Sequence, residues 1–228
     1  MNLMILFQDE VHHFFKIRAM MYLWILLPVM TVFAHVFNSD TGMMSYALFM
    51  TSMTATIIGV VAGALIASSI INEKQQNVYI PFIIRPLKRR DLLLARYFAV
   101  CGSMFVTVLV AIVIGLIVDI ISSGMSLNAD MIHELVYGFT LCSTIIFFSG
   151  SIGLLLGVVN SSVYVALMIY LFFGLQSGNL MIYMFSWIDD YAGVSIWWHR
   201  SLLQLAIGLV LTIGTLWMSV KFFNKKQF

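Results

Sequence analysis

Six long apolar runs dominate the sequence and restrict the folds that are open to it. A helix needs roughly 20 mostly apolar residues to cross about 30 Å of hydrocarbon. The runs that meet or approach this length are 19–37, 45–71, 92–120, 135–158, 162–178 and 202–223. Only 10% of the residues are charged, whereas soluble domains carry about 25%. The sequence therefore predicts an all-α, polytopic membrane protein with six transmembrane helices in a single transmembrane domain, residues 1–228.

The basic residues orient these predicted spans. With a cytoplasmic N-terminus, all but one of the 12 Lys and Arg residues fall on cytoplasmic segments. They are Lys16, Arg18, Lys74, Arg85, Lys88, Arg89, Arg90, Arg96, Lys221, Lys225 and Lys226, and the exception is Arg200. Short cytoplasmic loops carry an excess of Lys and Arg. We therefore expect both termini to be cytoplasmic, in a multi-pass protein of the plasma membrane.

Two segments outside the spans have their own patterns. Residues 1–18 place polar and apolar side chains on opposite sides at helical spacing, which predicts a helix in the inner membrane interface. The alternative is a frayed start of the first span. Residues 179–200 combine Tyr and Trp side chains, which prefer the headgroup level, with polar residues. We expect short outer helices there, between the last two spans; an ordinary aromatic loop is the alternative.

Small residues recur at every fourth position in two of the spans. Gly59 and Gly63 lie in the second span, and Gly153 and Gly157 lie in the fourth. Such stripes allow helix backbones to approach closely in lipid, where no hydrophobic effect drives association. We predict that these four glycines are helix-packing positions.

Motifs for chemistry are incomplete in this chain. The sequence HELVY at His133 begins like a zinc-protease motif but has Tyr137 where the second His is required. Ser151 and Ser177 lie in Gly-containing segments without the pattern of a catalytic nucleophile. The Met residues are scattered and favour core packing over copper binding. No phosphate-binding loop is present. We expect no catalytic residues, no metal site and no cofactor in this chain.

The stretch 72–96, NEKQQNVYIPFIIRPLKRRDLLLAR, holds half of the Lys and Arg residues between two spans. Its apolar side chains include Tyr79, Phe82 and Ile83, which suit a pocket on a partner protein. Arg85–Pro86 predicts a turn, since the residue before proline disfavours helix. A basic loop that only fixes topology is the alternative, but orientation alone does not require the apolar cluster. We therefore predict a cytoplasmic docking segment over 72–96.

This stretch resembles the signature of ABC transporter permeases of the type-2 exporter class. In that signature a Glu-basic opening leads through a Leu-rich segment to a proline, an arginine, an acid and a closing base. The matching residues here are Glu73, Lys74, Phe82, Ile83, Pro86, Arg89, Asp91 and Arg96, and Arg90 belongs to the same basic run. The sequence departs from the signature at Gln75, Asn77, Val78, Ile80 and Pro81. The predicted N-terminal helix, six spans and outer helices agree with the plan of this class.

The resemblance implies a permease that couples to a separate ATP-binding-cassette subunit, which would bind ATP and Mg²⁺. It also implies a second copy of the permease, or a related permease, as a partner in the bilayer; no nucleic-acid partner is expected. We predict export of an amphiphilic cargo such as a hydrophobic peptide, a drug-like molecule or a lipid-linked compound. Two alternatives stay open, namely a non-transporting membrane anchor or sensor for such an ATPase and an intramembrane enzyme.

Overall fold

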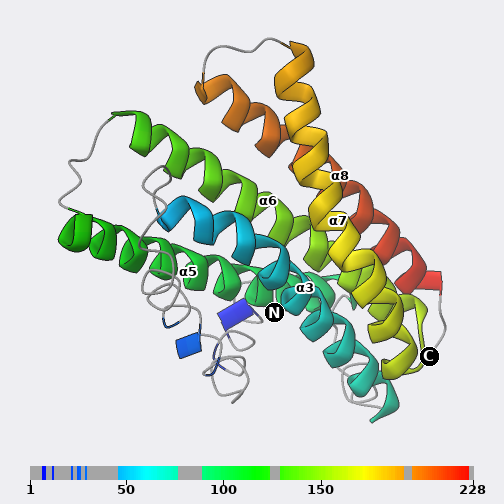
Figure 1. The fold of residues 1–228 in the computed structure, drawn as a ribbon. Coiled ribbons are helices and arrows are strands. Elements are labelled where there is room, and N and C mark those ends of the chain that lie inside the picture. The colour runs from blue at the N-terminus through cyan, green and yellow to red at the C-terminus, as the bar shows by residue number, and fades with distance from the viewer. Residues whose placement is uncertain are drawn as a thin grey trace.

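The computed structural model describes residues 46–76, 89–123, 129–192 and 197–225, with a few positions in the first 29. These segments form helices (Figure 1). The helices are α3 (Tyr46–Gln75), α5 (Arg89–Ser123), α6 (Ala129–Val159), α7 (Val163–Ala192) and α8 (Trp197–Lys225). Each contains a segment long and apolar enough to cross a membrane, so the described residues provide 5 candidate spans. The predicted interfacial helix over 1–18 and first span over 19–37 lie outside the described residues, apart from those few positions.

Helix α6 is the centre of the bundle and contacts each of the other four described helices (Figure 1). Its largest contact is with α3, and the next largest is with α8. Helices α3, α6 and α8 end where α5 and α7 begin, and we call this the basal end of the bundle. Residues buried from all sides, such as Ile66, Tyr97 and Ile146, form the core between α3, α5 and α6. The apolar spans predicted from the sequence thus pack mainly around one helix.

The contact between α3 and α6 is made by glycines. A Cβ atom added to Gly153 would overlap the backbone of Gly63, and one added to Gly157 would lie 3.0 Å from the Cα of Ala67. A Cβ on Gly59 would lie 2.9 Å from the side chain of Ile145. The two backbones therefore approach to a distance that larger residues would prevent. This is the geometry expected where lipid supplies no hydrophobic force between helices.

Helix α7 differs from the prediction. The sequence predicts that a span ends at residue 178 and that short outer helices occupy 179–200. Instead, α7 runs without a break to Ala192, and α8 already begins at Trp197. The polar residues near 178 do not end the helix, because Ser177 donates a hydrogen bond to the Gly174 carbonyl and Gly178 packs against Thr56 of α3. The expectation of short outer helices is wrong for the described residues, since 179–192 and 197–200 extend the last two long helices.

Tyr170 joins three helices through its hydroxyl group. It lies on α7, is fully buried, and donates a 2.9 Å hydrogen bond to the Gly59 carbonyl of α3. The same hydroxyl shares a 2.6 Å hydrogen bond with the Ser149 hydroxyl of α6. The ring lies directly beside Gly63, where any side chain would collide with it. Glycines on α3 therefore admit both α6 and the Tyr170 ring of α7.

The Tyr170→Phe substitution should lower stability without changing the fold. Phe keeps the shape of the ring but removes the hydroxyl, so the Gly59 carbonyl and Ser149 lose a buried partner. An interhelical hydrogen bond in a membrane contributes about 0.6–2 kcal/mol, which corresponds to a fall in melting temperature of about 2–6 °C for a chain of this size. Thermal unfolding in detergent measures it. Tyr164→Phe is the matched control, since Tyr164 of the same helix is 83% exposed; an equal fall in both variants would contradict the assignment.

Candidate functional site

The predicted docking residues lie at the basal end of the bundle where the structure describes them. Glu73 and Lys74 are in the last turn of α3, and Arg90, Asp91 and Arg96 are in the first two turns of α5. Arg89 is the first residue of α5, and only its backbone is described. The predicted contact residues Tyr79, Phe82, Ile83, Arg85 and Pro86 lie outside the described residues. The candidate site therefore consists of the end of α3 and the start of α5, which residues 77–88 connect.

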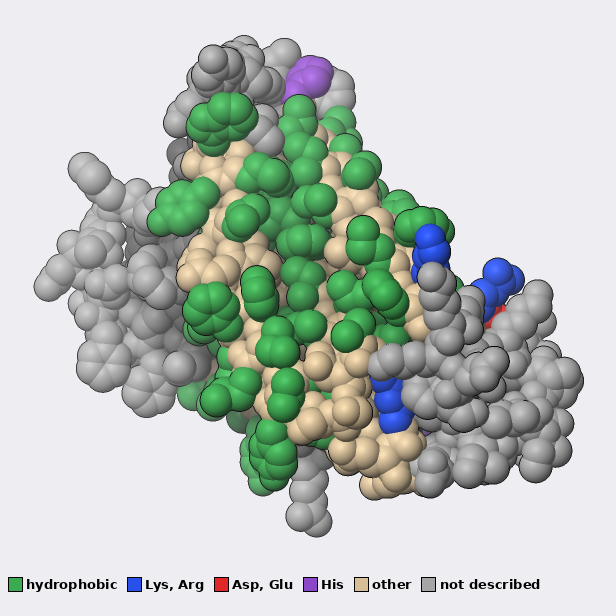
Figure 2. All heavy atoms as spheres, turned by 90° about the vertical axis from the view of Figure 1, so that its right-hand side faces the viewer, with side chains coloured by type: hydrophobic (Ala, Val, Ile, Leu, Met, Phe, Trp, Pro, Cys, Tyr) green, Lys and Arg blue, Asp and Glu red, His purple; other side chains and the backbone are tan. Residues whose placement is uncertain are grey.

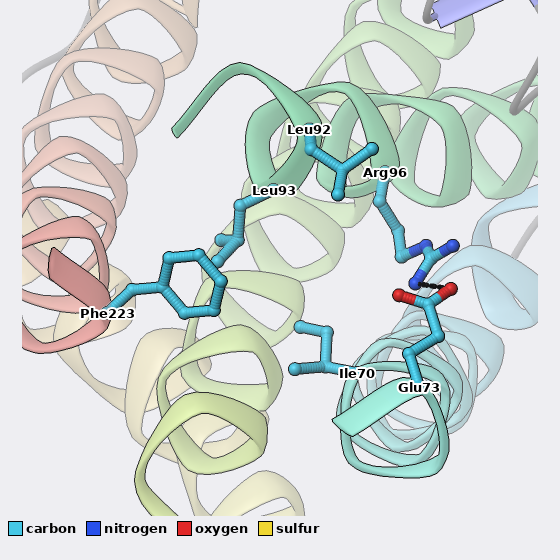
Figure 3. A pocket seen from close by; sticks show the side chains of 6 residues that line it. All are labelled: Ile70, Glu73, Leu92, Leu93, Arg96 and Phe223. Carbon is cyan, nitrogen blue, oxygen red and sulfur yellow. Dashed lines mark ion pairs between the residues drawn. The ribbon is translucent and has the colours of Figure 1, made fainter. Parts of the chain in front are cut away.

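Glu73 and Arg96 form an ion pair between these two helix ends (Figure 3). Their side chains are 19% and 14% exposed, respectively, so water reaches both groups only partly. Ile70, Leu93 and Phe223 lie beside the pair and bring α3, α5 and α8 together, as the sticks in Figure 3 show. The cavity between them is only about 10 Å³, the volume of a single water at most. The pair thus holds helices together and offers no room for a ligand.

Lys74 binds the end of a different helix. Its Nζ atom donates hydrogen bonds of 2.6 and 2.7 Å to the carbonyl oxygens of Gly157 and Val158, and lies 3.5 Å from that of Asn160. The last carbonyls of a helix lack partners within the helix and carry partial negative charge. A Lys ammonium has three N–H donors and satisfies them well. Lys74 of α3 therefore caps α6.

Gln75 extends this contact into the turn between α6 and α7. Its Nε2 atom donates a 3.1 Å hydrogen bond to the Ser161 carbonyl. We call Glu73, Lys74 and Gln75, with Arg96 and the 157–161 backbone, the basal clasp. The end of α3, from which residues 77–88 continue, is thereby tied to α5 on one side and to α6 and its turn on the other.

Arg90 and Asp91 form a more exposed pair at the start of α5. The Arg90 Nε atom lies 3.3 Å from the Asp91 carboxylate, and the Arg90 side chain is 56% exposed. Exposed pairs of this kind contribute little to stability. Asp91 also places negative charge in the first turn of α5, which the helix dipole favours. Arg90 is thus a described basal cation whose side chain faces outward and can contact another protein.

The partner of Lys74 is the part of this site that sequence reasoning missed. Lys74 is bound by backbone carbonyl oxygens of residues 157–160, and the side chains of these residues do not indicate a cation site. The run Asn160-Ser161-Ser162 is nevertheless a turn signal, and it marks a helix end whose carbonyls need donors. Among the described residues, no group of three or more His, Cys, Asp or Glu side chains could hold a metal ion. The clasp is therefore a structural joint, built from hydrogen bonds and one ion pair.

Comparison with protein families decides the class of the chain. The family described as ABC-2 family transporter protein matches residues 13–177, which include α3, α5, α6 and the clasp. The chain belongs to the ABC-2 transporter family. A comparison with individual curated proteins gave no match. ABC-2 family proteins are membrane subunits for transport, are generally not catalytic, and usually work with an ATP-binding-cassette subunit.

Membership in the ABC-2 family gives the helices and their surface a common explanation. Figure 2 shows one face of the molecule on which hydrophobic side chains cover much of the described area, with Lys and Arg along its right-hand side. Large apolar side chains are exposed on every described helix, among them Ile57, Val113, Phe172 and Trp217. In water such a surface would be unfavourable, but in a bilayer it faces hydrocarbon. This ABC-2 protein is a multi-pass membrane protein.

Proposed function

We propose that this chain is the permease subunit of an ATP-driven exporter. In this proposal a separate ATP-binding-cassette subunit binds ATP and Mg²⁺, and its movement reaches the permease through the segment that the basal clasp holds. The permease pairs with a second copy or with a related permease in the plasma membrane. The cargo is an amphiphile such as a hydrophobic peptide, a drug-like molecule or a lipid-linked compound. The observation that best supports this proposal is the basal clasp, which links the proposed docking segment to the helix bundle.

The clasp suits the transmission of force because it fixes both helix ends to which residues 77–88 are attached. Residues 77–88 connect α3 to α5, and Glu73 pairs with Arg96 across that connection. A displacement of the segment therefore moves α3 and α5 together. Through Lys74 the same displacement pulls on the end of α6, the helix that contacts all the other described helices. A push at the basal end would in this way reach the whole bundle.

The charges support a cytoplasmic basal end. The basic residues with described side chains there are Lys74, Arg90, Arg96 and Lys221, and the helices also begin at Arg89 and end at Lys225 at this end. Since cytoplasmic segments carry an excess of Lys and Arg, this end faces the cytoplasm in the proposed arrangement, and so do both termini. An ATP-binding subunit has access to the clasp only from that side.

Reversing the charge of Arg90 should weaken the bond to the ATP-binding subunit. We expect Arg90→Glu to lower recovery of that subunit about three- to tenfold, because a charge at the edge of an interface steers and orients the partner. The tagged chain is purified from its native membranes, and the ATP-binding subunit is quantified by mass spectrometry and by Mg-ATP hydrolysis. Lys221→Glu is the matched control, since Lys221 is an exposed basal cation on α8 whose Nζ atom lies 4.8 Å from the centre of the Trp217 ring.

Equal recovery with both variants would contradict docking at the start of α5. Transport is tested separately by reconstituting the purified complex into vesicles with candidate amphiphiles. Hydrolysis that rises with cargo, together with movement of that cargo out of the cytoplasmic compartment, is the result expected for an exporter. A complex that hydrolyses ATP at a constant rate and moves no cargo would instead indicate a membrane anchor or sensor.

A further inference from the structure

A lateral groove lies on the side of the bundle formed by α5, α6 and α8, and on α5 its lining begins at Tyr97 and Phe98, directly after Arg96 of the basal clasp. Its volume is about 470 Å³, within the range of about 300–1,000 Å³ typical of small-molecule sites. Aromatic side chains and the apolar side chains of α8 form most of its wall. The principal ones are Phe98, Phe105, Phe139, Phe147, Leu209 and Ile213. Among the described residues, no Lys, Arg, Asp or Glu lines the groove.

Three hydroxyl groups in the groove bond to carbonyls of α6, the helix that carries them, whereas the buried Thr212 hydroxyl of α8 has no hydrogen-bond partner among the described residues. Thr140 donates to the Tyr137 carbonyl at 2.8 Å, Ser143 to the Phe139 carbonyl at 2.7 Å, and Thr144 to the Thr140 carbonyl at 2.7 Å. Their hydrogens are therefore not offered to an occupant. A polar ligand would lose its bonds to water and gain few in return, which is costly. Apart from the Thr212 hydroxyl, the groove therefore favours an apolar occupant.

The groove opens onto the surface that faces the bilayer. Leu209 and Ile213 at its rim are 58% and 61% exposed, and they continue into the exposed apolar surface of α8 at Leu202 and Val210. All three helices that form the groove are candidate membrane spans. From residue 205 to residue 216 of α8 the groove is about 17 Å long, at about 1.5 Å per helical residue. This length is about half of the roughly 30 Å hydrocarbon layer, and residues 205–216 lie across the middle of the span Ser201–Phe223.

We propose that this groove binds one hydrocarbon chain of a membrane lipid. The chain lies along α8 between the Phe side chains of α5 and α6, in continuity with the lipid that surrounds the bundle. Its apolar wall, the engaged hydroxyls of α6 and its opening onto the lipid-facing surface fit this occupant. The proposal does not depend on the transport function, because its evidence is the lining and opening of the groove and not the contacts of the clasp.

The test uses the full chain in nanodiscs of phosphatidylcholine that contain a small fraction of phosphatidylcholine with a photoreactive diazirine on one acyl chain. After illumination, labelled peptides are mapped by mass spectrometry. We expect labelling concentrated on the groove, at the α5 and α6 peptides that carry Phe105 and Phe139. Ile213→Trp fills the opening and should lower this labelling about tenfold, the effect of a misfit in an apolar pocket. Val210→Trp, at a 69% exposed position beside the groove, should leave it unchanged.

Two results would overturn the proposal. Labelling spread evenly over all exposed apolar positions would show only the general lipid layer around the bundle. A groove without any label in the unaltered chain would show that another protein surface, such as a second copy of this chain, occupies it. Leu209→Trp serves as a second filling variant if Ile213→Trp does not fold, and melting temperatures of all variants are compared with that of the unaltered chain.

Discussion

Gly153→Ala is expected to lower the melting temperature of the protein in detergent by about 2–12 °C. The single added methyl group would overlap the Gly63 backbone, and a backbone cannot rotate away as a side chain can. Helices α3 and α6 must then separate, which also disturbs the Tyr170 hydroxyl contacts. Overpacking of this kind costs about 1–3 kcal/mol or more, at about 2–4 °C per kcal/mol for a chain of this size.

Gly214→Ala provides a control with the opposite expected sign. A Cβ atom added to Gly214 of α8 meets nothing within 4 Å. Ala is favoured over Gly in a helix by about 0.5–1 kcal/mol, so this variant should melt at the same temperature or slightly higher. A small or absent effect of Gly153→Ala, equal to that of Gly214→Ala, would show that α3 and α6 do not depend on close backbone contact.

Exchanging the charges of the basal clasp gives the second large expected effect. Glu73→Arg places two guanidinium groups together at a partly buried site, and Arg96→Glu places two carboxylates there. Each single variant should lose most Mg-ATP-driven transport and melt earlier. The double variant restores an ion pair and should recover most of both. The coupling energy from the double-mutant cycle is expected to be about 1–3 kcal/mol.

The two readouts separate structure from function. Melting temperature reports the ion pair whether or not the chain transports anything. Recovery of stability without recovery of transport would mean that the pair holds the helices but that the identity of each residue matters to the ATP-binding subunit. Simple addition of the two single effects would contradict the ion pair itself.

The sequence predicts the membrane spans well where the length of an apolar run alone determines where the helix begins and ends. The runs 92–120 and 135–158 correspond to α5 and α6, which extend a few residues beyond them. The run ending at 178 fails, because Gln176, Ser177 and Asn179 look like a loop in isolation. In the structure the Ser177 hydroxyl bonds within its own helix and Gly178 meets α3. Contacts between helices distant in sequence decide this case, and composition cannot supply them.

For the candidate site as well, the sequence identifies some of the residues, but their contacts are visible only in the structure. The resemblance points to Glu73, Lys74 and Arg96 as residues that belong together. It does not show that Glu73 and Arg96 pair with each other, or that Lys74 binds the end of α6. These contacts join residues up to 86 positions apart, and only the three-dimensional arrangement brings them together. Docking of the segment on an ATP-binding subunit stays a prediction.

The glycine contact also sets an order for biosynthesis. About 90 residues separate Gly63 from its neighbour Gly153, which the ribosome needs on the order of ten seconds to synthesise. During that interval α3 is already in the membrane, but its close-packing surface has no α6 to meet and is covered by lipid. The close α3–α6 contact therefore forms only after α6 arrives, whereas α5, which also contacts α3, is synthesised earlier. Variants at these glycines should consequently affect membrane insertion yield and degradation of nascent chains as well as the stability of the finished protein.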